Sequence, residues 1–364
     1  MPLARPAAFA TRTVLAREYV LVRLTTEEGI SGLGFTYAGS NAGSVVSEAV
    51  ATLLAPTLVG RPRHLIEGLW ELMYRGALLH GRAGSVMRAL SALDIALWDL
   101  NAKAASMPLW QYLGAYRDER VPCYASGGYY KEGTSNGELP AEMKGYVDRG
   151  FRVVKMKIGR ADAGVEELRV RGVREAIGPD VMLLLDANNA WTDLFSAVQT
   201  VKRLEPFFPA WIEEPFSPDD IDNHARLSSA TTIPIATGEI EAGRWRFRSL
   251  LEARAAQVLQ PDALVCGGIT EWRRIAALAS AYGVPVCPHA WHDIHVHLVA
   301  ATPNAPFVEY FVDEDIVCTQ PLLTRRMKVE DGHLLLPKDI GLGFDFLENC
   351  VDQHAVSRWH TVSH

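Results

Sequence analysis

The sequence contains no apolar run long enough to cross a membrane and no dense cluster of basic residues. A membrane-spanning helix needs about 18–20 consecutive apolar residues, and no stretch of this chain reaches that length. The formal net charge is −7, and lysine and arginine never gather beyond a pair or triplet, which argues against a nucleic-acid surface. The N-terminus lacks the apolar core of a signal peptide. We therefore expect a cytoplasmic protein that binds neither membranes nor nucleic acids.

Cysteine is also scarce. The chain has five cysteines, an odd number, and none of them stands in a C-x-x-C spacing. This pattern argues against a disulfide framework and against a structural zinc site. Cys266 and Cys287 lie in or beside apolar runs, so we interpret them as small buried hydrophobic residues.

The first part of the chain combines strands with helices. Residues 19–25 and 30–37 predict the two strands of a hairpin, with a turn at residues 27–29. Helical spacing of apolar residues predicts helices over 44–54, 65–74 and 86–105. The glycine-rich stretch 38–43 has the composition of a mobile flap.

From about residue 121 to about residue 298, strands alternate with helices, which predicts a parallel sheet. At least six such repeats suit a closed (β/α) barrel of the modified TIM type, and a chain of 364 residues can hold this barrel and a second domain. Short strands return at 326–329 and 334–336, with a turn at 341–343. We predict an α+β capping domain (1–118), a catalytic barrel (119–320) and a C-terminal segment that completes the cap (321–364).

Ionisable residues recur in the second half of the chain, each just after a short apolar run. The steps between them are 20 to 29 residues, about one strand–helix unit. The carboxyl ends of parallel barrel strands meet at one mouth, where such enzymes carry out their chemistry. The series therefore predicts one site, built from Lys157, Asp186, Glu213, Glu239, Asp262, His289 and Glu309.

Three carboxylates, Asp186, Glu213 and Glu239, end three consecutive predicted strands. An all-oxygen ligand set suits Mg²⁺, whereas zinc normally takes histidine or cysteine. A single carboxylate at such a place is often a helix cap or a surface charge, but three at matched positions favour a metal site. Glu213 and Glu214 point to opposite sides of the strand, and the apolar pattern leaves the choice between them open.

The same region offers candidate acid/base groups. Lys155 and Lys157 face the same way on their strand, and we expect their mutual repulsion to lower a lysine pKa toward the range of a base. The alternative is a pair of lysines on an exposed edge strand. Asp262 and His289 follow successive strands, where a carboxylate can bond one ring nitrogen and leave the other for proton transfer. We interpret the neighbouring His292, His295 and His297 as structural.

The motifs that contain these residues resemble the enolase superfamily, mandelate-racemase subgroup. The family pattern K-x-K, D-x-N, E-E-P, G-E, P-D and P-H stands here as Lys155-Met156-Lys157, Asp186-Ala187-Asn188, Glu213-Glu214-Pro215, Gly238-Glu239, Pro261-Asp262 and Pro288-His289. Residues 94–99 are similar to the subgroup's cap helix. Within the subgroup the chain is most similar to acid-sugar dehydratases, through residues 32–37, 126–128, 236–239 and 295–298.

The resemblance implies a role for each site residue. It selects Glu213 from the doublet as the third Mg²⁺ ligand beside Asp186 and Glu239. It implies that Lys157 is a general base with Lys155 as its electrostatic partner. It implies that Asp262 and His289 form an acid/base dyad. It also implies that Glu309 hydrogen-bonds a substrate carboxylate oxygen and that Asn188 approaches the metal or substrate.

The implied reaction begins with removal of the α-proton of a carboxylate substrate and gives an enediolate. We expect dehydration of an acid sugar to a 2-keto-3-deoxy acid, with a racemase, epimerase or cycloisomerase as the alternative and a non-catalytic barrel as a remote one. We also expect a homo-oligomer. The chain departs from the family twice: the first cap strand is expected to be short or missing, and residues 37–43 lack the lysine or arginine that some sugar-diacid enzymes carry there.

Overall fold

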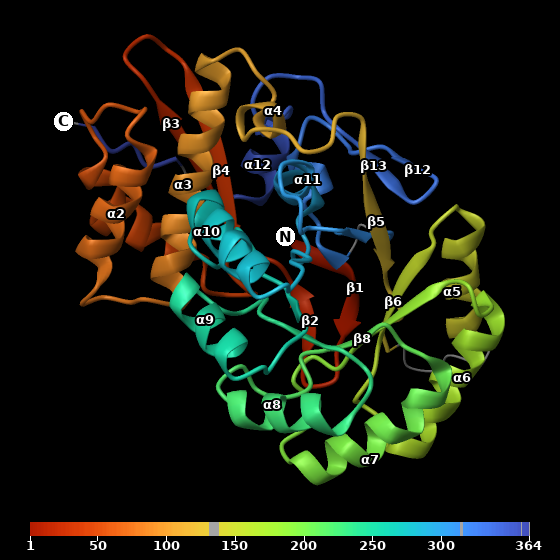
Figure 1. Cartoon of the computed structure of the whole chain (residues 1–364). Coiled ribbons are helices and arrows are strands. Elements are labelled where there is room, and N and C mark those ends of the chain that lie inside the picture. The colour runs from red at the N-terminus through yellow and green to blue at the C-terminus, as the bar shows by residue number, and fades with distance from the viewer. Residues whose placement is uncertain (131–137, 314–315, 358, 364) are drawn as a thin grey trace.

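The computed structural model describes residues 1–130, 138–313, 316–357 and 359–363. It has two parts, a barrel of parallel strands and a cap (Figure 1). In the part of the chain that the structure describes, every helix is too short or too polar to span a bilayer.

The barrel is a nearly closed ring of parallel strands. Six strands pair in chain order, and a seventh pairs back onto the first. The gap between the sixth and seventh strands is bridged at Val286, which pairs with Leu259. The strands are β5 (Arg120–Ser126), β6 (Val153–Lys157), β7 (Met182–Asp186), β8 (Trp211–Glu213), β9 (Ile235–Thr237), β10 (Val258–Leu259) and β11 (Val308–Phe311).

Helices surround these strands on the outside (Figure 1). The predicted alternation of strand and helix is confirmed. Each helix from α5 to α10 follows a strand in the chain, and α11 follows the isolated bridge at Val286. The helices are α5 (Glu138–Asp148), α6 (Ala163–Ile177), α7 (Leu194–Leu204), α8 (Ile221–Ala230), α9 (Arg244–Glu252), α10 (Gly268–Ala281) and α11 (His292–Ala300).

Large apolar side chains fill the interior of the barrel below its mouth. Tyr124, Val153, Leu184, Trp211, Ala236, Val258 and Cys287 form one buried cluster. Side chains two positions further along a strand point to the same side. Lys155, Asp186 and Glu213 therefore point into the barrel directly above Val153, Leu184 and Trp211.

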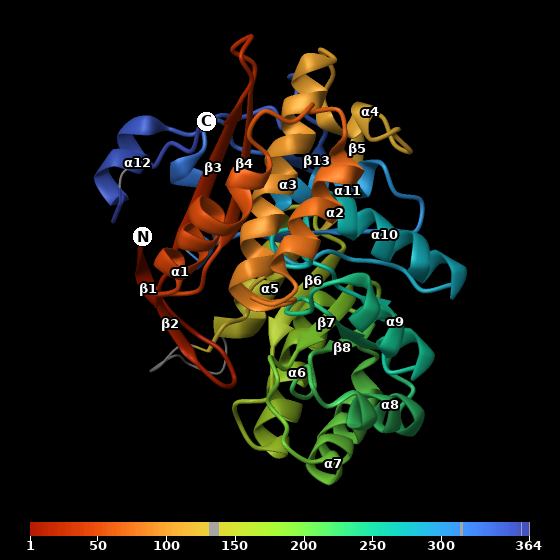
Figure 2. The same cartoon turned by 90° about the vertical axis from the view of Figure 1, so that its left-hand side faces the viewer.

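The cap packs a β-hairpin on a long helix. Strands β3 (Tyr19–Thr25) and β4 (Ser31–Tyr37) form the predicted hairpin, and β4 lies against α3 (Gly84–Ala104). Gly34 makes this close approach possible, because a Cβ at this position would collide with the carbonyl oxygen of Ala92 in α3. Figure 2 shows this hairpin, α3 and α2 (Ile66–Ala77) at one end of the molecule and helices α6 to α9 at the other.

A first cap strand is present, and the expectation that it is short or missing is wrong. Strand β1 (Pro2–Ala8) pairs in antiparallel fashion with β2 (Thr13–Ala16). The hairpin is fixed to the barrel, since Ala8 bridges to Tyr130 and the Thr11 hydroxyl donates to the backbone oxygen of Asn188 at 3.2 Å. Few of its residues belong to a buried face, so the apolar pattern did not reveal it.

The C-terminal segment joins both parts. Strand β12 (Val329–Glu330) is shorter than expected, and β13 (His333–Leu335) begins one residue earlier than expected. Strand β13 extends the barrel sheet by pairing with β5. Beyond them the chain packs on the cap, where the Leu342 amide donates to the Asp99 carboxylate at 2.7 Å. Helix α12 (Glu348–His354) begins at Glu348, which pairs with Arg23 at 2.6 Å. The domain boundaries at 118 and 320 stay a prediction.

A buried carboxyl group joins the cap to the barrel. Asp94 on α3 accepts hydrogen bonds from the backbone nitrogen and the hydroxyl of Thr270 on α10, at 2.9 and 2.6 Å. The Trp98 indole donates to the same hydroxyl at 2.9 Å. Burial raises the pKa of Asp94 to about 7, although the bonds from Thr270 favour the charged form.

We expect this carboxyl group to make stability fall as the pH rises from about 4 to about 7. The folded chain holds a proton on Asp94 that the unfolded chain releases near the ordinary pKa of 3.8, so the unfolded state binds fewer protons in this range. The contribution is complete below pH 4 and lost above pH 7. Asp94→Asn should remove it, which amounts to at most about 4 kcal/mol. Urea unfolding of both proteins at pH 4.5 and 7.5 measures this, and an unchanged pH dependence in the variant contradicts it.

Candidate active site

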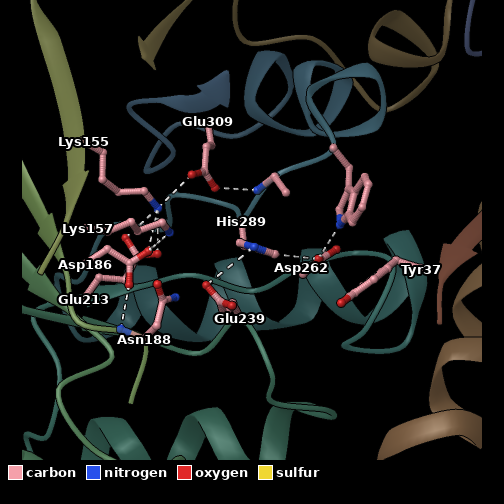
Figure 3. A network of polar contacts seen from close by, with 12 residues as sticks. Tyr37, Lys155, Lys157, Asp186, Asn188, Glu213, Glu239, Asp262, His289 and Glu309 are labelled. Atoms are coloured by element: carbon pink, nitrogen blue, oxygen red, sulfur yellow. Dashed lines mark hydrogen bonds and ion pairs between the residues drawn. The ribbon is translucent and has the colours of Figure 1, made fainter. Parts of the chain in front are cut away.

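The register of three neighbouring strands brings the first site residues together. Lys157 at the end of β6 lies opposite Asp186 at the end of β7, and Asp186 lies opposite Glu213 at the end of β8. Glu239 follows β9, just after Gly238, whose φ of 126° turns the chain there. Figure 3 shows these side chains converging on one space inside the mouth.

Asp186, Glu213 and Glu239 form a compact group of carboxylates. One oxygen from each lies within 4.8 Å of the others, and all three residues are buried. The Glu239 oxygen Oε2 has no hydrogen-bond partner. This set of oxygen donors, one of them unpartnered, fits a hard divalent cation such as Mg²⁺.

The structure separates the two members of the glutamate doublet. Glu213 belongs to the carboxylate group, whereas Glu214 does not. Both carboxyl oxygens of Glu214 are buried without a hydrogen-bond partner. Burial and the nearby Glu239 raise the pKa of Glu214 well above its ordinary value, which favours its neutral form.

The two lysines are embedded among carboxylates. Lys155 Nζ lies 2.7 and 2.9 Å from the two Glu213 oxygens and 2.8 Å from Glu309 Oε1, and Lys157 Nζ lies 2.5 Å from Asp186 Oδ2. The expectation of a lowered lysine pKa is wrong for this arrangement. Burial lowers the pKa of each lysine, but the surrounding carboxylates outweigh burial and the repulsion of the other lysine, and both pKa values are raised.

The pKa values of Asp186 and Glu213 shift in opposite directions, because the charges around the two carboxyl groups differ. Burial raises the pKa of Asp186, but Lys157 and Lys155 overcome this effect and hold it at about 2. Burial and the charge of Asp186 raise the pKa of Glu213 to about 8, against the pull of Lys155. Adjacent carboxyl groups with separated pKa values are a common feature of catalytic sites.

Asp262 and His289 form the predicted pair. His289 Nδ1 lies 2.9 Å from Asp262 Oδ2, and the Trp291 indole donates to the same oxygen at 2.7 Å. His289 Nε2 is directed to the carboxylate group, 3.6 Å from Glu239 Oε2 (Figure 3). Burial lowers the pKa of His289, but Glu239 and Asp262 raise it more, to about 9. The imidazole therefore holds a proton near neutral pH.

The other histidines of this region hydrogen-bond backbone groups or a neutral side chain, and His292 and His295 also lie 3.6 and 3.8 Å from the carboxylates of Asp293 and Asp262. His295 lies 2.7 Å from the Ala290 oxygen and accepts from the Ala263 nitrogen at 3.0 Å. His297 lies 3.2 Å from the Leu342 oxygen, and burial lowers its pKa to about 3. His292 lies 3.2 Å from the Gln320 amide. These contacts agree with the structural interpretation.

Glu309 and Asn188 complete the expected set. Glu309 accepts from the Ala290 nitrogen at 2.7 Å. Burial raises the pKa of Glu309, but Lys155 and His289 lower it to about 2, so this carboxyl is ionised and needs a proton before it can donate to a substrate. The Asn188 backbone nitrogen donates to Asp186 Oδ1 at 3.0 Å, while the side-chain oxygen of Asn188 is buried without a hydrogen-bond partner.

A small cavity lies between these residues and the cap. Lys157, Asn188, Glu239 and His289 line one part of it. The remaining lining was missed by sequence reasoning. It comes from the β1–β2 turn and the residue after β2, from the end of β4, from the residues that follow His289, and from residues in or beside β5 and β11. It consists of Phe9, Arg12, Arg17, Tyr37, Tyr129, Ala290, Trp291, Phe311 and Val317.

Two family models match this chain over most of its length. Residues 1–114 match the mandelate racemase / muconate lactonizing enzyme N-terminal domain, and residues 138–350 match the enolase C-terminal domain-like family. Together they cover both the cap and the barrel.

Characterised relatives and solved structures agree with this. The chain is 33% identical over 359 residues to L-talarate/galactarate dehydratase of Salmonella typhimurium, covering 96% of this chain and 87% of the relative. It is 37% identical over 297 residues to 3,6-anhydro-alpha-L-galactonate cycloisomerase of Streptomyces coelicolor, covering 80% of each. A crystal structure of a racemase from Streptomyces coelicolor with bound magnesium superposes with a TM-score of 0.91 at 32% identity, covering 98% of this chain and 97% of that one. The chain therefore belongs to the mandelate racemase and muconate lactonizing enzyme branch of the enolase superfamily.

Proposed function

We propose that this protein is a Mg²⁺-dependent acid-sugar dehydratase that removes the α-proton of its substrate and releases a 2-keto-3-deoxy acid. One observation carries the proposal. Lys157, at the end of β6, and His289, in the segment before α11, approach the group of three carboxylates from different places, Lys157 beside Asp186 and His289 beside Glu239. This arrangement provides two proton-transfer groups around one substrate carboxylate (Figure 3).

Asp186, Glu213 and Glu239 would hold the cation. A bound divalent cation offsets the negative charge that develops on a carboxylate substrate when its α-proton is removed. Lys155 lies beside Glu213 and Glu309 at 2.7–2.9 Å, and its ammonium group can donate to a substrate oxygen at the same place.

Lys157 would take the proton. In the structure its ammonium is held by Asp186, so it acts as a base only after it loses that proton. Asp186 is the group that raises the pKa of Lys157 most. A cation bound to Asp186 would weaken this effect and so lower the pKa of Lys157. Lys157 also lies over the rings of Phe9 and Tyr129, at 5.3 and 5.2 Å, and these rings limit the access of water to it.

His289 would supply the acid. Its pKa of about 9 keeps it protonated near neutral pH, and a protonated imidazole can assist the departure of a β-hydroxyl group. The same two groups also suit a racemase or epimerase, in which the second group returns a proton to the opposite face. This alternative is the second candidate function.

Glutamine substitutions in the doublet test the metal ligands. We expect Glu213→Gln to weaken Mg²⁺ binding on the order of 100-fold, because an anionic oxygen ligand is replaced by a neutral amide. Glu214→Gln is the matched control and should change the affinity little, since Glu214 lies outside the carboxylate group. Isothermal titration of each variant with MgCl₂ measures the affinity. Equal losses in both variants, or a larger loss in Glu214→Gln, contradict the assignment.

Alanine substitutions test the two proton-transfer groups. We expect Lys157→Ala and His289→Ala each to lower kcat by about 1000-fold or more, while Mg²⁺ binding and the circular dichroism spectrum stay unchanged. Exchange of the substrate α-proton with deuterium should persist in one variant only, because the remaining group abstracts from its own face. Proton NMR in D₂O follows this exchange. Full activity of either variant rules out the two-group proposal.

The product separates a dehydratase from a racemase. We expect a semicarbazide-reactive ketone to accumulate when the protein is incubated with MgCl₂ and a library of acid sugars that carry a 3-hydroxyl group. Loss of water gives an enol, and the enol tautomerises to the 2-keto-3-deoxy acid. Absorbance of the semicarbazone measures it. Changed optical rotation with deuterium uptake at carbon 2, without ketone, would instead identify a racemase or epimerase.

A further inference from the structure

Two arginines line the same cavity as the proton-transfer groups: Arg12 in the turn between β1 and β2, and Arg17 just after β2. Arg17 is 7% exposed, and Arg12 stacks over the Phe9 ring at 5.3 Å. The ion pairs within the described ranges include neither Arg12 nor Arg17. A buried charge normally has a partner of opposite charge, because transfer of a lone ion out of water is costly.

The hydrogen bonds of Arg17 leave most of its donors unused. Its Nε donates to the Ile316 oxygen at 3.1 Å, and its Nη1 donates to the Tyr37 hydroxyl at 2.9 Å. A guanidinium has five N–H groups; two of them are used in these bonds, so three remain among the described contacts. Its planar arrangement of donors matches a carboxylate, which it can bind through two parallel hydrogen bonds.

Tyr37 holds Arg17 in this position. The Arg17 guanidinium lies 5.1 Å from the centre of the Tyr37 ring, and the Arg88 guanidinium lies 5.2 Å from the same centre. Arg88 also donates to the Tyr37 backbone oxygen at 2.7 Å. Figure 3 shows the Tyr37 hydroxyl directed from the cap toward His289 and Glu239. A group that contacts Arg17 and Tyr37 therefore lies on the cap side of the reacting atoms.

We propose that Arg17, assisted by Arg12, binds the second carboxylate of a sugar diacid, so that the preferred substrate is an aldarate and not an aldonate. The inference rests on the proposed function, because it takes the first carboxylate to lie at the metal site. Residues 37–43 contain no lysine or arginine, and Arg12 in the β1–β2 turn and Arg17 just after β2 supply the cations in their place.

The test compares matched substrates that differ only in the terminal group. Each aldarate is paired with the aldonate of the same configuration at the remaining carbons, for example galactarate with galactonate, and kcat/KM is measured by ketone formation. We expect the wild-type protein to prefer the aldarate of the best pair by at least about tenfold. Arg17→Gln should lower kcat/KM for the aldarate by about 10- to 100-fold and leave the aldonate within about threefold.

Further variants separate substrate contact from a structural role. Arg17→Lys keeps the charge and should recover part of the aldarate activity. Arg12 is exposed, so Arg12→Gln should leave the fold intact. It should cause a smaller loss of kcat/KM than Arg17→Gln, again only for the aldarate. Arg5→Gln is the matched control, because Arg5 lies exposed on β1 outside the cavity and its loss should affect neither substrate.

The outcomes distinguish this inference from the proposed function. Equal losses for aldarate and aldonate in Arg17→Gln and Arg12→Gln, or a wild-type protein that prefers aldonates, overturn the diacid subsite and leave the dehydratase intact. Preference for an aldonate that carries a terminal phosphate would keep an anion subsite but overturn its assignment to a carboxylate. Absence of ketone from every acid sugar overturns the proposed function, and the diacid subsite with it.

Discussion

The alignment of β6, β7 and β8 is the constraint on which the rest of the site depends. Lys157, Asp186 and Glu213 lie side by side because these strands are parallel and in register. A shift of one residue would turn their side chains from the interior of the barrel to its outer face. The apolar cluster below the mouth fixes this register, since Val153, Leu184 and Trp211 must point inward for the barrel to be filled.

The second constraint is the balance of buried charge. Taken at their formal charges, the five carboxylates Asp186, Glu213, Glu239, Asp262 and Glu309 face three cations, Lys155, Lys157 and His289. A bound divalent cation would offset this excess of two negative charges and favour the ionised form of Glu213, whose pKa burial and Asp186 raise to about 8. The shifted pKa values of the lysines, of His289 and of Glu309 all follow from this crowding, because low solvent exposure strengthens the interaction of each charge with its neighbours.

The cap contacts the site through residues that lie far apart in the chain. Trp291 donates to Asp262, the partner of His289, and its ring also packs against Tyr19 and Tyr37 of the β3–β4 hairpin, at 5.5 Å from each. The hydroxyl of the same Tyr37 accepts a hydrogen bond from Arg17, which lies just after β2. The Asp262–His289 pair and Arg17 are therefore connected through the rings of Trp291 and Tyr37.

The sequence by itself determined the barrel, the order of its strands and the residues of its mouth, because strand ends recur at a regular spacing and parallel strands bring their ends together. It could not determine the protonation of those residues. A fall in the lysine pKa was expected from the repulsion between Lys155 and Lys157. In the fold, Glu213, Asp186 and Glu309 surround the two lysines and raise both pKa values. Only the tertiary structure separated Glu213 from Glu214, placed the β1–β2 hairpin, and brought Arg17 within reach of a site more than a hundred residues away in sequence. These outcomes depend on long-range packing and on burial, which no local pattern records.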